Sequence, residues 1–367
     1  MLAALGIATQ ANAQTSWNST SDATWSTAAN WTAGLPSTGP QLAIYPGTAT
    51  LQKTLNVAAT GRVSIGMQFD FTAGGSGYVF NGTAGSAPGF FPRAGGVVNG
   101  IVNNDDNAQT FNVPIKLTSN TGVAGSGAAM TWNAAAGDLI FNGNNNAPAA
   151  LWTINLNGAS ALTIDGSFNT TIGSIGPGQI VNTNGATPTG LIKNGSGILT
   201  LGGTAANTYV GTNKINAGTV MAAKANAFGS GNALILAGGT FNSGGLGQAL
   251  GTLDMDGTAT IDFGAGTSPL SFANSSLVNW GAFTLNLLDW TSGSDTLRIG
   301  TDATGLTAAQ LNQIVFSDLP GSPTAQIDAS GFVTPVPIPE PSALAFGFLA
   351  LVGLSVRIRR YSWVCGQ

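Results

Sequence analysis

The sequence predicts an all-β protein, a parallel β-helix (β-solenoid) followed by a single C-terminal transmembrane helix. Three observations support this: a glycine-rich and weakly charged composition, short alternating strands at regular spacing, and an uncharged apolar run near the C-terminus. Of 367 residues, 53 are glycine, 7% are charged and 43% are hydrophobic. Disordered chains combine low hydrophobicity with high net charge, so this composition predicts a folded core with many turns between strands.

Several chemistries are excluded or disfavoured by the residue types present. The chain has no histidine and one cysteine, Cys365. A Ser-His-Asp triad is therefore excluded, as are an intrachain disulfide and a cysteine zinc site. We expect no cofactor. Positions 14–339 carry eight basic residues against 14 aspartates, whereas nucleic-acid binding needs a basic stripe, so we expect no nucleic acid as partner.

The body of the chain contains short alternating segments bounded by Gly or Asn, which adopt tight-turn conformations easily. The predicted strands are Thr54–Val57, Arg62–Ile65, Gln68–Phe71, Thr110–Val113, Ile115–Leu117, Asp138–Phe141, Trp152–Leu156, Ala161–Ile164, Ile198–Leu201, Gly218–Met221, Ala233–Leu236, Gly251–Met255 and Thr258–Phe263. Strand starts near 198, 218, 233 and 251 are about 15 to 20 residues apart, the order of one solenoid coil. We therefore favour a solenoid over an ordinary sandwich.

One segment of the body also carries a family resemblance. Gly195–Gly203, Asn207–Thr212 and Ile215–Val220 together resemble the autotransporter-associated β-strand repeat, here at 191–222. That repeat occurs in passenger domains that fold as parallel β-helices, so the resemblance implies the same fold for this chain. The chain ends in a different kind of segment from the translocator barrel of that family, so the resemblance carries the fold and not the transport mechanism.

The predicted organisation places the solenoid between two caps. It comprises a Trp-rich N-terminal cap at 14–50, the solenoid at 51–276, a C-terminal cap region at 277–333 and a Pro-rich linker at 334–341. Trp17, Trp25 and Trp31 cover an open coil end or, alternatively, form a carbohydrate-stacking platform. A helix is predicted only at Leu306–Ile314, with Thr307 as its N-cap.

The C-terminus predicts a membrane anchor. Residues 343–356 contain no charge, and three arginines follow within four positions. A helix over 342–358 is about 25 Å long, near the lower limit for spanning a bilayer core of about 30 Å. Because it is apolar on all sides, such a helix is buried in protein or lies in lipid. The arginines place its far end in the cytoplasm, so the bulk of the chain lies outside the inner membrane.

A Pro-Glu-Pro-Ser motif, a short apolar helix and a basic cluster, in this order, resemble the PEP-CTERM sorting signal, here at 339–360. The resemblance implies processing by an exosortase, a membrane protease-transpeptidase of Gram-negative bacteria that typically make exopolysaccharide. The implied recognition motif is Pro339, Glu340 and Pro341, and the implied cytoplasmic stop is Arg357, Arg359 and Arg360.

The N-terminus predicts a signal peptide at 1–13. An apolar run is followed by Ala11 and Ala13, the small-x-small pattern that directs signal peptidase to cleave before Gln14. No basic residue precedes the run, so we expect the true start to lie upstream. A buried N-terminal helix is the alternative.

Clustered aspartates are the only candidates for catalysis. They are Asp105 and Asp106, and the set Asp254, Asp256 and Asp262. Because Asp254 and Asp256 alternate with apolar residues, they share one strand face. No basic residue occurs from 225 to 297, so we interpret them as solvated surface groups; a weak Ca²⁺ site at Asp254, Asp256 and Gly257 lacks a full ligand set.

The sequence therefore predicts a non-enzymatic protein that reaches the cell surface or extracellular matrix of a Gram-negative bacterium. The expected role is structural or adhesive, in association with exopolysaccharide or a biofilm. Its expected partners are the Sec translocon, signal peptidase, the inner membrane, exosortase and exopolysaccharide. The alternative is a β-helix enzyme, a lyase or hydrolase, that degrades polysaccharide.

Overall fold

The computed structural model describes most of the chain between the two predicted sorting segments. The described residues are 13–36, 41–57, 62–64, 66–71, 73, 75–82, 90–92, 100–117, 129–143, 153–156, 161–183 and 190–336. The predicted transmembrane helix at 342–358 lies outside them. Within the described ranges, no helix has the length and apolar character needed to cross a bilayer.

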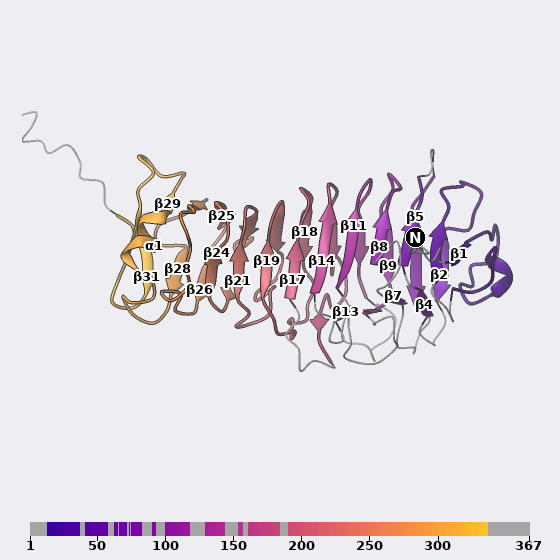
Figure 1. The fold of residues 1–367 in the computed structure, drawn as a ribbon, viewed down its shortest axis with the longest axis horizontal. Coiled ribbons are helices and arrows are strands. Elements are labelled where there is room, and N and C mark those ends of the chain that lie inside the picture. Colours follow the sequence, from indigo (N-terminus) through magenta and orange to yellow (C-terminus); the bar gives the residue numbers. More distant parts are fainter. Residues whose placement is uncertain are drawn as a thin grey trace, which may run out of the picture.

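Almost all regular structure consists of strands in four sheets (Figure 1). Sheet 1 is 10-stranded: β1 (Ala13–Ser16), β2 (Gln41–Tyr45), β5 (Gly66–Phe69), β8 (Gly100–Asn103), β11 (Met130–Ala134), β14 (Ala161–Gly166), β17 (Gly190–Lys193), β19 (Asn213–Ile215), β21 (Leu234–Leu236) and β24 (Leu253–Met255). Sheet 2 is 11-stranded: β3 (Thr54–Val57), β6 (Val79–Gly82), β9 (Gln109–Asn112), β12 (Leu139–Phe141), β15 (Thr170–Ile172), β18 (Ile198–Leu201), β20 (Thr219–Ala222), β22 (Thr240–Asn242), β25 (Ala259–Asp262), β27 (Leu285–Leu288) and β29 (Ile314–Phe316).

The third side of the stack is formed by two shorter sheets. Sheet 3 contains β4 (Arg62–Ser64), β7 (Phe90–Pro92), β10 (Ile115–Lys116), β13 (Ile154–Asn155) and β16 (Ile180–Val181). Sheet 4 contains β23 (Gln248–Ala249), β26 (Pro269–Phe272), β28 (Thr296–Ile299), β31 (Phe332–Pro335) and β30 (Ala325–Ile327). Strand pairs are parallel except β28 with β31 and β30 with β31. The chain visits the sheets in turn, which confirms the predicted all-β architecture of stacked parallel strands, like that of a β-helix.

The length of one coil changes along the stack. Gly66 pairs with Gly100, a step of 34 residues, whereas Leu234 pairs with Leu253, a step of 19. The predicted strand starts near 198, 218, 233 and 251 are each within two residues of an observed start. However, they mix two sheets: β18 and β20 belong to sheet 2, and β21 and β24 to sheet 1. The predicted spacing of 15 to 20 residues therefore mixed two distances. The step from β20 to β21 joins two sheets, whereas the step from β18 to β20 joins neighbouring strands of one sheet.

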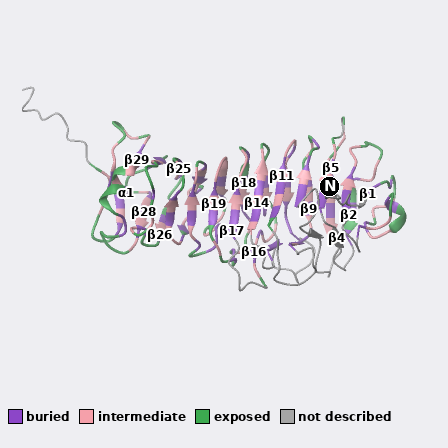
Figure 2. Cartoon of the chain, viewed as in Figure 1, coloured by how far each residue is buried: buried purple, intermediate pink, exposed green. Residues whose placement is uncertain are grey.

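The interior is filled by side chains that stack from coil to coil. In β11 the burial alternates, with Met130 and Trp132 inside and Thr131 partly exposed. Figure 2 shows buried and partly buried stretches along the strands of the stack. The rings of Phe80 and Phe111, and those of Phe111 and Phe141, are stacked with centroids 4.9 Å apart. This distance matches the spacing of adjacent strands. The core in this region thus contains a column of rings from successive strands of sheet 2, and Trp132 of sheet 1 stacks on Phe141.

Glycine is required where the corners of successive coils approach. Gly195 and Gly218 have φ of +62° and +66°, in the left-handed region that side chains disfavour. A Cβ on Gly195 would lie 2.2 Å from the carbonyl oxygen of Gly166. Close stacking of backbone on backbone thus explains part of the glycine content.

Three indole rings cover the N-terminal end of the stack. Trp17, Trp25 and Trp31 are 1%, 1% and 3% exposed. The Trp31 ring centroid lies 5.3 Å from that of Trp17, 5.2 Å from that of Trp25 and 5.6 Å from that of Tyr45. We call Trp17, Trp25 and Trp31 the N-terminal closure. Rings buried to this extent leave no free face on which a sugar can stack.

A helix and hydrogen-bonding side chains cover the C-terminal end. The predicted helix is confirmed as α1 (Ala308–Gln313), with Thr307 as N-cap and a capping box with Gln310. Gln310 Nε2 also donates to the carbonyl of Ser275, and Trp280 Nε1 donates to that of Leu253. We call Ser275, Trp280, α1 and the hairpin β30–β31 the C-terminal closure.

The parallel stack is longer than the predicted range 51–276. Strands β1 and β2 belong to sheet 1, and β27 and β29 extend sheet 2 to Phe316. In addition, Thr334 and Pro335 pair with β30, so the predicted linker at 334–341 begins inside a strand. The start of the linker was predicted from proline content, and Pro335 is the last residue of β31.

Candidate functional site: a polar strip on sheet 1

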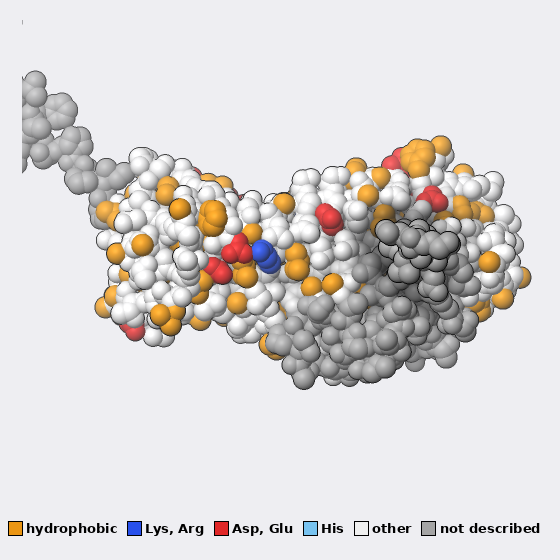
Figure 3. Space-filling model, in the orientation of Figure 1, with side chains coloured by type: hydrophobic (Ala, Val, Ile, Leu, Met, Phe, Trp, Pro, Cys, Tyr) orange, Lys and Arg blue, Asp and Glu red, His pale blue; other side chains and the backbone are white. Residues whose placement is uncertain are grey.

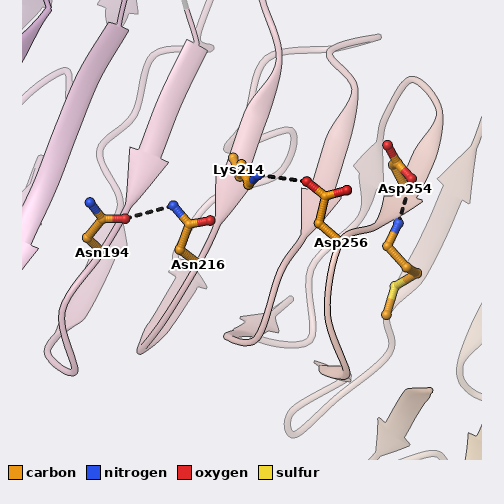
Figure 4. A network of polar contacts seen from close by, with 6 residues as sticks. Asn194, Lys214, Asn216, Asp254 and Asp256 are labelled. Atoms are coloured by element: carbon orange, nitrogen blue, oxygen red, sulfur yellow. Dashed lines mark hydrogen bonds and ion pairs between the residues drawn. The ribbon is translucent and has the colours of Figure 1, made fainter. Parts of the chain in front are cut away.

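A strip of polar side chains lies on the outer face of sheet 1, from β17 to β24. Figure 4 shows its members: Asn194, Lys214, Asn216, Asp254 and Asp256. They face outward because their neighbours face inward; Leu253 and Met255, for example, are 0% and 1% exposed. The strip contains the predicted aspartate pair, and the shared strand face predicted for Asp254 and Asp256 is confirmed.

An ion pair that the sequence did not reveal crosses two strands of the strip. Lys214 Nζ lies 2.7 Å from Asp256 Oδ2, and the two side chains are 33% and 46% exposed. The expectation that no basic group would lie near these aspartates was therefore wrong. Lys214 pairs with Ile235, which pairs with Asp254, so residues 42 positions apart in sequence lie two strands apart in space.

Asp254 is engaged at the edge of the sheet. Because β24 is the last strand of sheet 1, the N–H groups of Leu253 and Met255 have no following strand to bind. Ser275 Oγ accepts from Leu253 N at 2.9 Å, and Asp254 Oδ1 accepts from Met255 N at 2.8 Å. Burial raises the pKa of Asp254, and this hydrogen bond opposes that shift. The carboxylate thus takes the place of an absent strand.

Lys224, which is half-buried, joins neighbouring coils, whereas the buried Lys193 binds a carbonyl of its own coil. Lys224 Nζ donates to the carbonyls of Gly178 and Ala205, at 2.9 and 2.8 Å, and to Asn207 Oδ1 at 2.9 Å. Lys193, which is 3% exposed, donates to the carbonyl of Gly195 at 2.9 Å. Burial lowers the pKa of each amine to about 8. These cations therefore satisfy backbone acceptors inside the stack.

Asparagine side chains connect successive coils by hydrogen bonds to one another. Asn216 Nδ2 donates to Asn194 Oδ1 at 2.8 Å within the strip. On sheet 2, Asn142 donates to Asn112, and Asn112 to Asn81, each at 2.9 Å. The abundance of asparagine in the sequence was taken as a turn signal, and part of it serves instead in these ladders.

The remaining candidate aspartates are not brought to the strip. Asp262 belongs to sheet 2, where Asn242 Nδ2 donates to its Oδ2 at 2.6 Å. Asp105 is 0% exposed and accepts from Asn107 Nδ2 at 2.9 Å, whereas Asp106 is exposed. Over the ranges given above, no group of three or more acidic or cysteine side chains is arranged to hold a metal ion.

Two hollows flank Trp290 near the C-terminal end. One, of about 380 Å³, lies between the segment around Asp295 and β31; the other, of about 420 Å³, is bordered by Asp289 and Asp318. Asp295 is 3% exposed, and its two oxygens accept from the backbone N–H groups of Ser268 and Thr291. Its carboxylate is thus occupied within the protein.

The other predicted site residues belong to the two ends of the chain. Ala13 is the first residue of β1, and Ala11 lies outside the described residues. The sorting motif Pro339, Glu340 and Pro341 and the basic stop Arg357, Arg359 and Arg360 also lie outside them. Their assigned roles stay predictions.

On the described part of the face shown in Figure 3, charged side chains are few, and hydrophobic and other side chains cover most of the surface. The chain matches no protein-family model, no curated protein and no solved structure. The function is therefore inferred from the geometry and chemistry of the chain itself.

Proposed function

We propose that this protein is a structural or adhesive component of a Gram-negative cell surface or extracellular matrix. The observation that carries the proposal is that the charged side chains near the strip are bound to other groups of the protein. Lys193 and Lys224 bind backbone carbonyls, Lys214 binds Asp256, and Asp254 covers a sheet edge. Groups that catalysis would need are thus engaged within the protein, and Lys214 and Lys224 link separate coils.

The route to the surface follows from the two ends. A signal peptide at 1–13 directs the chain to the Sec translocon, and signal peptidase cleaves after Ala13. A helix at 342–358 then holds the chain in the inner membrane with its arginines in the cytoplasm. Exosortase recognises Pro339, Glu340 and Pro341 and completes sorting. The order of motif, apolar run and basic cluster supports this route.

We further propose exopolysaccharide as the main contact of the stack. Long uncharged surfaces that carry amide and hydroxyl groups suit hydrogen bonding to neutral polymers. Retention of the purified protein on exopolysaccharide from the producing bacterium tests this. We expect retention that salt does not abolish, because few surface charges are free to take part. Absence of retention on any polysaccharide would refute an adhesive role.

The alternative, a polysaccharide lyase or hydrolase, gains one specific observation. Lys214 places a cation against the carboxylate of Asp256, and its charge also acts on the pKa of Asp254; such chemistry requires groups of these kinds. Against it, both carboxylates are already engaged, one by Lys214 and one by the Met255 amide. Release of reducing ends from polysaccharide, lost in the variant Asp254→Asn, Asp256→Asn but retained in Asp106→Asn, would establish the enzyme.

A further inference from the structure

Near the C-terminal end of the stack, the segment beside α1 exposes two apolar side chains. Leu277 is 99% exposed, and Phe283 is 37% exposed. The residue after Leu277 is Val278, whose carbonyl accepts from Gln310 Nε2 at 2.9 Å. Near Phe283, the carbonyl of Gly281 accepts from Gln313 Nε2 at 2.7 Å. The segment that carries both side chains therefore lies along α1, to which the two glutamine side chains bind it.

The chain leaves the stack at this same end. Val336, the last described residue, is 39% exposed, and its N–H donates to the carbonyl of Thr324 at 2.8 Å. Val336 directly follows β31, which pairs with β30, and β30 lies against α1. Figure 1 places α1 and β31 at one end of an elongated body, with β1 and β2 at the other.

The distance between this end and the proposed anchor is short. Residues 337–341 are the only ones between Val336 and the helix proposed at 342–358. Five fully extended residues span at most about 17 Å. A helix that enters a bilayer at 342 therefore keeps the C-terminal end of the stack close to the membrane surface.

We propose that this end rests on the lipid surface, with Leu277 and Phe283 among the headgroups and the stack standing away from the membrane. This inference rests on the proposed anchoring by 342–358. Sheet 2 has 11 strands, and neighbouring strands are about 4.8 Å apart, so the N-terminal closure is held about 50 Å from the bilayer. In the precursor, before the tail is processed, the membrane thus sets which surfaces of the stack are accessible.

The net charge of the C-terminal end indicates which lipid headgroups it can approach. Residues 277–336 contain five aspartates and one basic residue, Arg298. An acidic end is repelled by anionic headgroups. The fitting partner is therefore a zwitterionic surface, and contact depends on burying apolar side chains rather than on charge.

The test places a fluorophore at three heights along the full-length chain. In a Cys365→Ser background, single cysteines replace Leu277 near the anchor, Ser230 in the middle or Ser21 at the far end; all three positions are exposed. Each labelled protein is reconstituted into phosphatidylcholine vesicles that contain a lipid with a nitroxide on its headgroup. We expect about twofold quenching at position 277, as for a side chain at headgroup depth, and no quenching at 230 and 21.

The outcomes separate this inference from the anchoring on which it rests. Protein that does not float with the vesicles refutes the anchor and the inference together. Protein that floats, yet shows no more quenching at 277 than at 21, refutes the inference alone. Equal quenching at all three heights shows a stack that lies flat on the bilayer, which refutes the proposed upright orientation. Self-quenching at 277 without nitroxide lipid assigns this surface to a second copy of the chain, which also overturns the proposal.

Discussion

The two ends of the stack meet the same requirement with different chemistry. An uncovered terminal coil exposes its apolar core and the unpaired edges of its strands. At the N-terminal end, three buried indole rings cover the core. At the C-terminal end, Ser275, Trp280 and Gln310 bind groups that lack a following strand, and β31 reverses direction. We conclude that one end is closed mainly by buried area and the other mainly by directional hydrogen bonds.

The largest expected effect is that of Trp31→Ala in the N-terminal closure. The ring packs against Trp17, Trp25 and Tyr45 and is 3% exposed. Its removal leaves a cavity and should lower the local free energy of unfolding by about 3–5 kcal/mol. Because coils contact mainly their neighbours, hydrogen exchange should accelerate in β1 and β2 and stay unchanged in β27 and β29. Equal acceleration at both ends would contradict independent closures.

A smaller effect is expected from Gln310→Ala in the C-terminal closure. The variant loses the capping box and leaves the carbonyls of Ser275 and Val278 without a donor. We expect a loss of about 2–3 kcal/mol, seen as faster exchange in α1 and β29. Gln313→Ala is the matched control, since Gln313 makes one exposed bond to Gly281 and should cost less than about 1 kcal/mol. Equal losses in the two variants would show that burial of the amide is irrelevant.

The smallest expected effect is on the pH dependence of local stability, which should have opposite signs around Asp22 and around Asp262. Hydrogen bonds from Asn30 and Thr24 lower the pKa of Asp22 to about 2, from an ordinary 3.8. Its stabilisation is present above pH 3.8 and is lost as the pH falls through about 2. Burial raises the pKa of Asp262, and the neighbouring carboxylate of Asp289 adds to this. At Asp262 the folded state then binds more protons than the unfolded state, so acidification from neutral pH stabilises the structure around this residue.

Hydrogen exchange corrected for intrinsic rates at pH 6, 4 and 2 measures both ends in one sample. The N-terminal closure should lose protection towards pH 2, whereas β25 and β27 should gain it below neutral pH. Asp22→Asn and Asp262→Asn each remove one of the two responses. A common response of both ends in the unmodified protein would show that neither carboxyl group determines it.

The sequence predicted local structure better than it predicted neighbours. Thr54–Val57 and Ile198–Leu201 were placed with both bounds as observed, and Thr307 was identified as a helix cap. These features depend on alternation and capping, which are local. By contrast, β11 was missed although its burial alternates, and β26 begins with a proline, a residue that weakens a strand prediction.

The candidate site was predictable only in part for the same reason. That Asp254 and Asp256 face outward followed from alternation. That Lys214 binds Asp256 required the register of three strands, and that register depends on coil lengths that vary from 34 to 19 residues. The role of Asp254 at a sheet edge required knowledge of where the sheet ends. Strand register between distant segments and the position of the sheet edge could not be predicted from the local pattern of one sequence.

Mass spectrometry of the C-terminus of the mature protein, isolated from its producing bacterium, tests the central claim most directly. If the chain is a surface component delivered by its tail, the mature form ends before Arg357 and lacks Arg359 and Arg360. A mature, surface-exposed protein that retains an intact Arg360 would contradict the proposed sorting.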